Sequence, residues 1–110
     1  MINWADFEKI EMRIGTIIEV CDFPKAIKPA YQLTIDFGTE IGIKKSSAQI
    51  TTQYKKDELI GKQIVAVINF PKKQIADFMS ECLVLGSIGS ENDVVLLSSD
   101  KVVANGLRVG

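Results

Sequence analysis

Apolar and polar residues alternate along much of this chain, a pattern typical of β-strands that bury one face. The clearest case is YQLTIDF at residues 31–37. Its inward side is predicted to carry Tyr31, Leu33, Ile35 and Phe37. A turn around Gly38 leads into a second run at 40–45, so the two runs are predicted to form a hairpin.

Five other segments also have strand character. Residues 12–22 (MRIGTIIEVCD) are rich in β-branched side chains, and Gly15 inside them indicates a bulge or bend in a long first strand. Residues 62–70 (KQIVAVINF) form a nearly continuous apolar run, which is typical of a central strand, and Pro71 ends it. Shorter strands are predicted at 82–86, 94–97 and 106–110. On the first strand, one side of the alternation carries Ile14, Thr16, Ile18 and Val20.

Helical signals are weak and confined to the middle of the chain. Residues 46–54 begin with serines that can cap a short helix, and 56–61 reads as a turn or a single helical turn. Three strands, a short helix and two or more further strands are the order of a five-stranded Greek-key barrel, the OB-fold, whose face and loops bind oligonucleotides or oligosaccharides. An SH3-like barrel or a sandwich has a compatible number of strands. The predicted fold class is therefore all-β.

Length and composition are those of one globular domain spanning residues 1–110, with 46% hydrophobic and 25% charged residues. No apolar run approaches the roughly 20 residues that a membrane-spanning helix needs, and the N-terminus does not resemble a signal peptide. A cytoplasmic location is therefore expected. Cys21 and Cys82 lie within apolar runs and are predicted to be buried free thiols.

The chain contains no histidine, which excludes Ser-His-Asp and Cys-His nucleophiles and His-rich metal sites. The triplet DFG at 36–38 matches the magnesium motif of kinases in letters only, because the glycine-rich and catalytic loops of a kinase are missing. A hairpin turn is the better interpretation. We expect no enzyme activity, no catalytic residue, no cofactor and no metal.

Charge is distributed unevenly along the chain. The net charge is −1, but residues 24–76 hold nine lysines against four acidic residues, whereas both ends are acidic. Such asymmetry can mark an electrostatic contact surface, and lysines on an unrelated solvated face explain it equally well. The segment NFPKKQIADFMSE at 69–81 lies between two apolar runs and is polar and basic. It fits either a crossing loop or a surface that contacts a partner.

Six segments carry a resemblance to a known family. They are DFEKIEMRIGTI (6–17), IDFGTEIGIK (35–44), SSAQIT (46–51), VINFPK (67–72), SECLVLG (80–86) and DVVLL (93–97). In these segments the chain resembles the tRNA-binding domain family over nearly its whole length. The resemblance implies an OB-fold whose N- and C-terminal extensions build a homodimer, and a surface that binds transfer RNA without base-specific reading. Small stand-alone members are also described as chaperones of unfolded or exported polypeptides.

The resemblance places the RNA-binding surface on Asn69, Lys72, Lys73, Met79, Ser80 and Glu81, with basic support from Lys28 and Lys44. Lysines neutralise phosphates, and the amide and hydroxyl groups bond phosphate, ribose or base. Solvated loop lysines, a capping asparagine and a turn serine are the simpler alternatives. Phe78 and Met79 offer apolar area for base stacking, although the core is favoured for Phe78. Basic family members have arginines after the proline, so lysines and the acidic Asp77 indicate modest, salt-sensitive tRNA binding.

A second function class is a chaperone that binds polypeptides in an apolar groove near the dimer interface. The candidate residues are Trp4, Phe7, Ile27 and Pro29. Alternatively, Trp4 and Phe7 only pack the N-terminal segment onto the barrel or onto a partner subunit.

Overall fold

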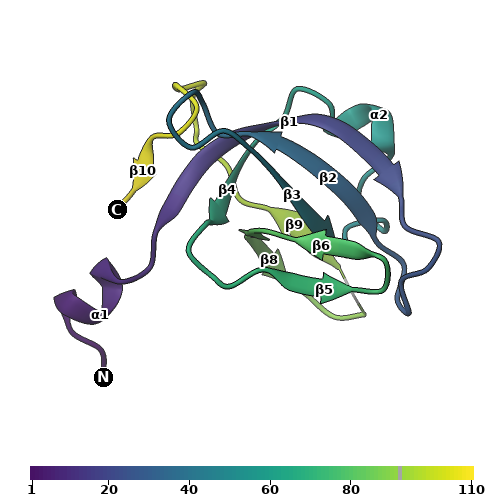
Figure 1. The fold of residues 1–110 in the computed structure, drawn as a ribbon, viewed down its shortest axis with the longest axis horizontal. Helices are drawn as coiled ribbons and strands as arrows, with labels where there is room; N and C mark the ends of the chain where they lie inside the picture. Colours follow the sequence, from purple (N-terminus) through teal and green to yellow (C-terminus); the bar gives the residue numbers. More distant parts are fainter. Residues whose placement is uncertain (92) are drawn as a thin grey trace.

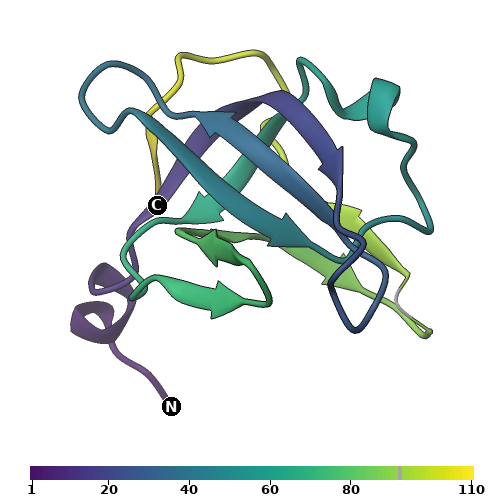
Figure 2. The ribbon, with the colours of Figure 1, turned by 45° about the vertical axis from the view of Figure 1, so that its right-hand side comes forward.

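A strongly curved antiparallel sheet forms the body of the molecule, as Figures 1 and 2 show. The structure is a computed structural model and describes residues 1–91 and 93–110. Its helices are α1 (Trp4–Glu8) and α2 (Lys56–Leu59). Its strands are β1 (Met12–Asp22), β2 (Tyr31–Asp36), β3 (Ile43–Ala48), β4 (Gln63–Val67), β5 (Lys73–Ile75), β6 (Phe78–Ser80), β7 (Leu83–Val84), β8 (Gly86–Ile88), β9 (Val94–Leu96) and β10 (Arg108–Val109).

Five strands of the sheet follow one another in the order β3-β2-β1-β4-β7, and β10 adds to the start of β1. The two ends of this path meet again. The Ser46 hydroxyl of β3 donates to the Cys82 carbonyl at 3.0 Å, and the Glu81 amide donates to the Lys45 carbonyl at 2.7 Å. These contacts nearly close the sheet into a barrel, which confirms the predicted all-β barrel and excludes the sandwich.

The long first strand bends, as predicted, but its bulge lies after Gly15. The pairing of β1 with β2 shifts register between Ile17 and Glu19. One extra residue in β1 shifts the alternation, so Ile14 and Ile17 are buried, Ile18 is exposed and Val20 packs against the core. The prediction that Ile14, Thr16, Ile18 and Val20 share one side of the strand is therefore wrong at Ile18. Gly15 has a packing role instead: a Cβ atom there would lie 2.7 Å from the side chains of Ile35 and Phe37.

The other strands largely follow their sequence patterns. Leu33, Ile35 and Phe37 are buried, and β4 is buried from Ile64 to Val67 in the middle of the sheet. The Gly38 turn joins β2 to β3, with the Gly38 amide donating to the Asp36 carboxylate at 2.8 Å. The predicted hairpin and the central position of β4 are therefore confirmed.

Two local predictions are wrong and one is confirmed. No helix spans 46–54, because β3 continues to Ala48 and pairs there with Tyr31, and this pairing outweighs the capping tendency of the serines. The single helical turn predicted at 56–61 is present as α2. Cys21 is exposed on β1, although Cys82 is buried and both thiols are free. No helix in the described part of the chain is both long and apolar enough to cross a membrane.

Candidate nucleic-acid interface

The basic segment at 69–81 is a β-hairpin rather than an irregular loop. Strands β5 and β6 pair from Lys73↔Ser80 to Ile75↔Phe78 and are joined by a two-residue turn at Ala76 and Asp77. Ala76 has a left-handed backbone conformation with φ of 51°. The hairpin stands against the barrel beside β3 (Figures 1 and 2).

A small apolar cluster fixes the tip of the hairpin to the loop that follows β1. Phe23 and Phe78 lie with their ring centroids 5.5 Å apart, and Ala30 completes the buried group. Lys25 and Asp77 add an exposed ion pair at 3.3 Å. Phe78 is therefore a core residue, as favoured from the sequence, and is not available for stacking with a base.

Ser80 and Glu81 form the seam between the hairpin and β3. One Glu81 carboxylate oxygen accepts the Lys45 amide at 3.0 Å, while the other pairs with the Lys72 ammonium at 3.4 Å. The Ser80 hydroxyl accepts the Ser47 amide at 3.4 Å and donates to the Cys82 carbonyl at 3.4 Å. Both residues thus hold the hairpin in place at the predicted surface.

Asn69 joins the start of this segment to the N-terminal part of the chain. Its amide oxygen accepts the Glu11 amide hydrogen at 3.0 Å, and its amide nitrogen donates to the Lys9 carbonyl at 2.7 Å. The Ile68 amide adds a backbone bond to the Glu11 carbonyl. These two side-chain bonds use both polar groups of Asn69, so the structure gives this residue a capping role.

The predicted cationic residues do not form one uniform cluster. Lys28 is exposed on the loop after β1, Lys44 is half-buried on β3, and Lys72 and Lys73 lie at the base of the hairpin. Lys72 is compensated by Glu81, whereas Lys73 has no acidic side chain within ion-pair distance in the described ranges 1–91 and 93–110. Met79 is 43% exposed on the outer side of β6.

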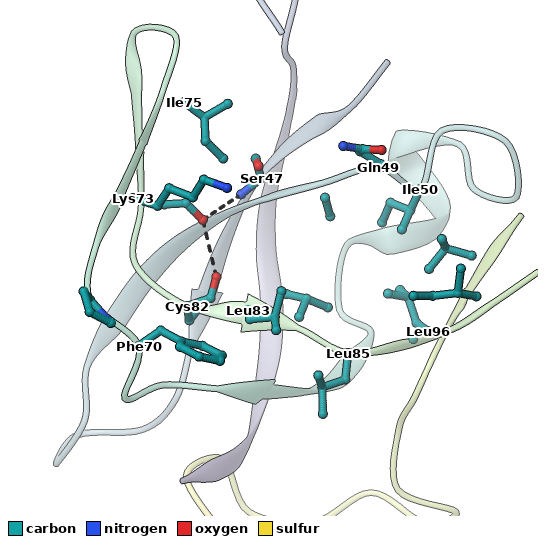
Figure 3. A pocket seen from close by; sticks show the side chains of 17 residues that line it. Ser47, Gln49, Ile50, Phe70, Lys73, Ile75, Cys82, Leu83, Leu85 and Leu96 are labelled. Atoms are coloured by element: carbon teal, nitrogen blue, oxygen red, sulfur yellow. Dashed lines mark hydrogen bonds between the residues drawn. The ribbon is translucent and has the colours of Figure 1, made fainter. Parts of the chain in front are cut away.

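A groove of about 610 Å³ opens next to the hairpin (Figure 3). Its floor is apolar and includes Leu85 and Leu96, and its edge carries Phe70 and Lys73. Phe70 is 55% exposed because β4 ends at Val67 and leaves this ring outside the sheet. Leu83, which lies in the strand predicted at 82–86, is half exposed in the groove wall.

Sequence reasoning missed Phe70 because it ends an apolar run that reads as one strand. The signal available was the adjacent Pro71, which disfavours a ladder position. Gln49, which also lines the groove, was hidden within the segment predicted as a helix.

The residues predicted for peptide binding lie at two separate places. Trp4, 80% exposed, and the half-buried Phe7 belong to α1, which projects from one end of the barrel (Figure 1). Ile27 and Pro29 are exposed on the loop at the far end of β1 (Figures 1 and 2). Within one chain these four residues do not form a common surface.

Comparisons with known proteins agree with this architecture. The model of the putative tRNA binding domain family matches residues 12–108. The methionine–tRNA ligase of Nanoarchaeum equitans is 35% identical over 99% of this chain, and that of Thermococcus onnurineus is 32% identical over 98%. The chain spans only 14% of the length of these two relatives.

Solved structures with chains of similar extent are also similar. The chaperone CsaA from Bacillus anthracis has a TM-score of 0.95 with 49% identity, covering 100% of this chain and 99% of that one. The CsaA chaperone protein from Picrophilus torridus has a TM-score of 0.93 with 56% identity and complete coverage of both chains. With a family match over most of its length and a CsaA-like structure, the chain belongs to the tRNA-binding domain family.

Proposed function

We propose that the protein is a non-catalytic RNA-binding module that binds tRNA through the β5–β6 hairpin and the adjacent face of β3, and that it acts as a homodimer. The observation that carries this proposal is the lysine pair Lys72 and Lys73 at the base of a hairpin that is fixed to the barrel on two sides. A fixed hairpin presents cations to a polyanion with little loss of backbone entropy on binding. Family membership supports tRNA as the ligand.

The two lysines are expected to contribute unequally. Glu81 lies 3.4 Å from Lys72 and already compensates part of its charge, so a phosphate has to compete with this carboxylate. Lys73 has no such competitor in the described part of the chain. We therefore assign the main phosphate contact to Lys73 and a smaller one to Lys72, with Lys28 and Lys44 adding longer-range attraction.

The test is tRNA binding as a function of salt concentration for the parent chain, Lys72→Ala and Lys73→Ala. Each phosphate contact that is lost lowers the slope of log K against log salt by about 0.7–0.9. We expect a slope change of this size for Lys73→Ala and a smaller one for Lys72→Ala. Lys101→Ala is the matched control, because Lys101 is exposed and lies outside the hairpin and β3. Unchanged affinity and slope in both hairpin variants would remove this surface from the proposal.

A second candidate function is binding of unfolded polypeptides, as the name chaperone given to the CsaA structures suggests. The observation in its favour is apolar exposure: Met1, Ile2, Trp4 and Ile27 are all largely exposed. Suppression of aggregation of a denatured model protein is expected to weaken in Trp4→Ser and in Ile27→Ser if these residues contact the client. Identical suppression by the parent chain and both variants would contradict this role for them.

A further inference from the structure

We propose that the groove beside the hairpin binds one unpaired nucleotide of an RNA chain, with the base stacked on Phe70 and the phosphate at Lys73. This inference rests on the proposed RNA-binding function and specifies the ligand as single-stranded RNA rather than a helical stem. Phe70 is not among the RNA-binding residues expected from the sequence, and the groove was not predicted.

Phe70 is held in place on both sides although its ring is exposed. On the N-terminal side, the Ile68 amide and both polar groups of Asn69 are bonded to the backbone at Lys9 and Glu11. On the C-terminal side, Pro71 restricts its own φ and the backbone of the residue before it. An aromatic ring in such a setting gives a stacking surface that loses little entropy when a base covers it.

Lys73 brings positive charge to the same groove. Its side chain lies on the wall that the hairpin contributes, on the same side as Phe70 (Figure 3). No aspartate or glutamate occurs among the described residues that line the groove. Ser47 lies beside Lys73, and Gln49 lies across the groove from Phe70, so both supply polar groups that can meet the edge of a base.

The size and floor of the groove fit a single nucleotide. A volume of about 610 Å³ lies within the range of roughly 300–1,000 Å³ that small-molecule sites occupy. The apolar floor at Leu85 and Leu96 suits the faces of a nucleobase, and a base paired inside a stem does not expose those faces. An apolar peptide would also fit the floor, but it would make no use of the Lys73 charge.

The test compares three probes: a single-stranded RNA tetranucleotide, its abasic analogue and a short RNA duplex. Phe70→Leu keeps apolar volume but removes the flat ring, and Phe70→Trp keeps a ring. We expect Phe70→Leu to weaken binding of the tetranucleotide about tenfold, with little change for the abasic analogue and the duplex. Phe70→Trp should retain the parent affinity, and the introduced indole should be quenched by the tetranucleotide but not by the abasic analogue.

Val102→Ala is the control, because Val102 is an exposed apolar side chain outside the groove. Phe70 lies outside both core clusters, so parent-like thermal unfolding is expected for its variants.

Equal affinity of the parent and Phe70→Leu for the tetranucleotide would overturn the inference, as would an equal loss for tetranucleotide and duplex. If either result is found while Lys73→Ala lowers the slope of log K for tRNA binding against log salt, the proposed function remains intact. The groove would be assigned to polypeptides if an apolar peptide bound the parent but not Phe70→Leu, while tetranucleotide binding stayed unchanged. This result would also overturn the inference.

Discussion

Two cysteines in one small barrel occupy opposite environments. Cys21 is exposed on β1, and its thiol donates to the Glu19 carboxylate at 3.5 Å. This hydrogen bond, with a smaller contribution from desolvation, raises the pKa of the Cys21 thiol. Burial raises the pKa of Cys82 to about 12. Because the thiolate is the reactive form, both thiols are less reactive than an ordinary cysteine near neutral pH, and Cys82 is inaccessible as well.

Thiol labelling should separate the two residues. With iodoacetamide at pH 8, we expect slow modification of Cys21 in the folded protein and modification of Cys82 only after denaturation, measured by mass spectrometry of proteolytic peptides. Glu19→Gln removes the negative charge beside Cys21 and should accelerate labelling at that residue alone. Comparable rates at Cys82 and Cys21 in the folded protein would show that the β3–β7 seam opens readily.

At the scale of secondary structure, α1 depends on polar contacts for its position. The helix contains no buried residue, and it is connected to the barrel by the Asn69 bonds and by Arg108, which donates to the Glu8 carbonyl at 3.1 Å. Asn69→Ala removes two of these bonds, each of which contributes on the order of 1 kcal/mol. We expect faster hydrogen exchange of the Glu11 amide and faster tryptic cleavage after Lys9, with the barrel core unaffected.

Two further variants test the capping role of Asn69. Asn69→Asp keeps the acceptor for the Glu11 amide but loses the donor to Lys9, so its effect should be intermediate. Asn3→Ala removes the N-cap of α1, where Asn3 accepts the Asp6 amide at 2.9 Å, and it should destabilise the helix without exposing the Glu11 amide. An unchanged Glu11 exchange rate in Asn69→Ala would mean that α1 is held by other contacts.

Elements were predictable wherever burial alone decides the pattern. β2 buries one face, which gives alternating apolar residues, and β4 is buried almost throughout, which gives a continuous apolar run. The β5–β6 hairpin was not predicted because its turn uses Ala76 and Asp77, without the glycine or asparagine that usually marks a left-handed position.

The candidate site was only partly predictable for a related reason. Its lysines are visible in the sequence, but the different charge compensation of Lys72 and Lys73 comes from long-range packing. Lys72 meets Glu81 across the hairpin, and Glu81 is fixed by the Lys45 amide, 36 positions away in sequence. Phe70 becomes exposed only because β4 stops at Val67. Local sequence does not encode the Lys72–Glu81 contact, and for the exposure of Phe70 its only signal is the adjacent Pro71.

At the scale of the whole molecule, the apolar N-terminus packs against little of its own chain as described at 1–91 and 93–110. Met1, Ile2 and Trp4 are largely exposed at the end of the barrel from which α1 projects (Figure 2). A second copy that covers these side chains would account for their exposure, and for a chain of 110 residues it would add to a small core. We expect sedimentation equilibrium at micromolar concentration to give twice the chain mass of 12.1 kDa.

If the terminal extensions build the interface, Trp4→Ser should shift this equilibrium towards the monomer. Ile27→Ser alters another exposed apolar side chain, at the far end of β1, and should leave the equilibrium unchanged. The proposed dimer would present two basic hairpins to one tRNA, so its loss should reduce tRNA affinity through avidity by as much as ~10²-fold. The tetranucleotide reaches only one groove, and its affinity should be the same for Trp4→Ser and the parent. Sedimentation of the parent chain as a monomer would contradict the predicted dimer. A monomeric Trp4→Ser variant with undiminished tRNA affinity would show that each barrel binds tRNA alone.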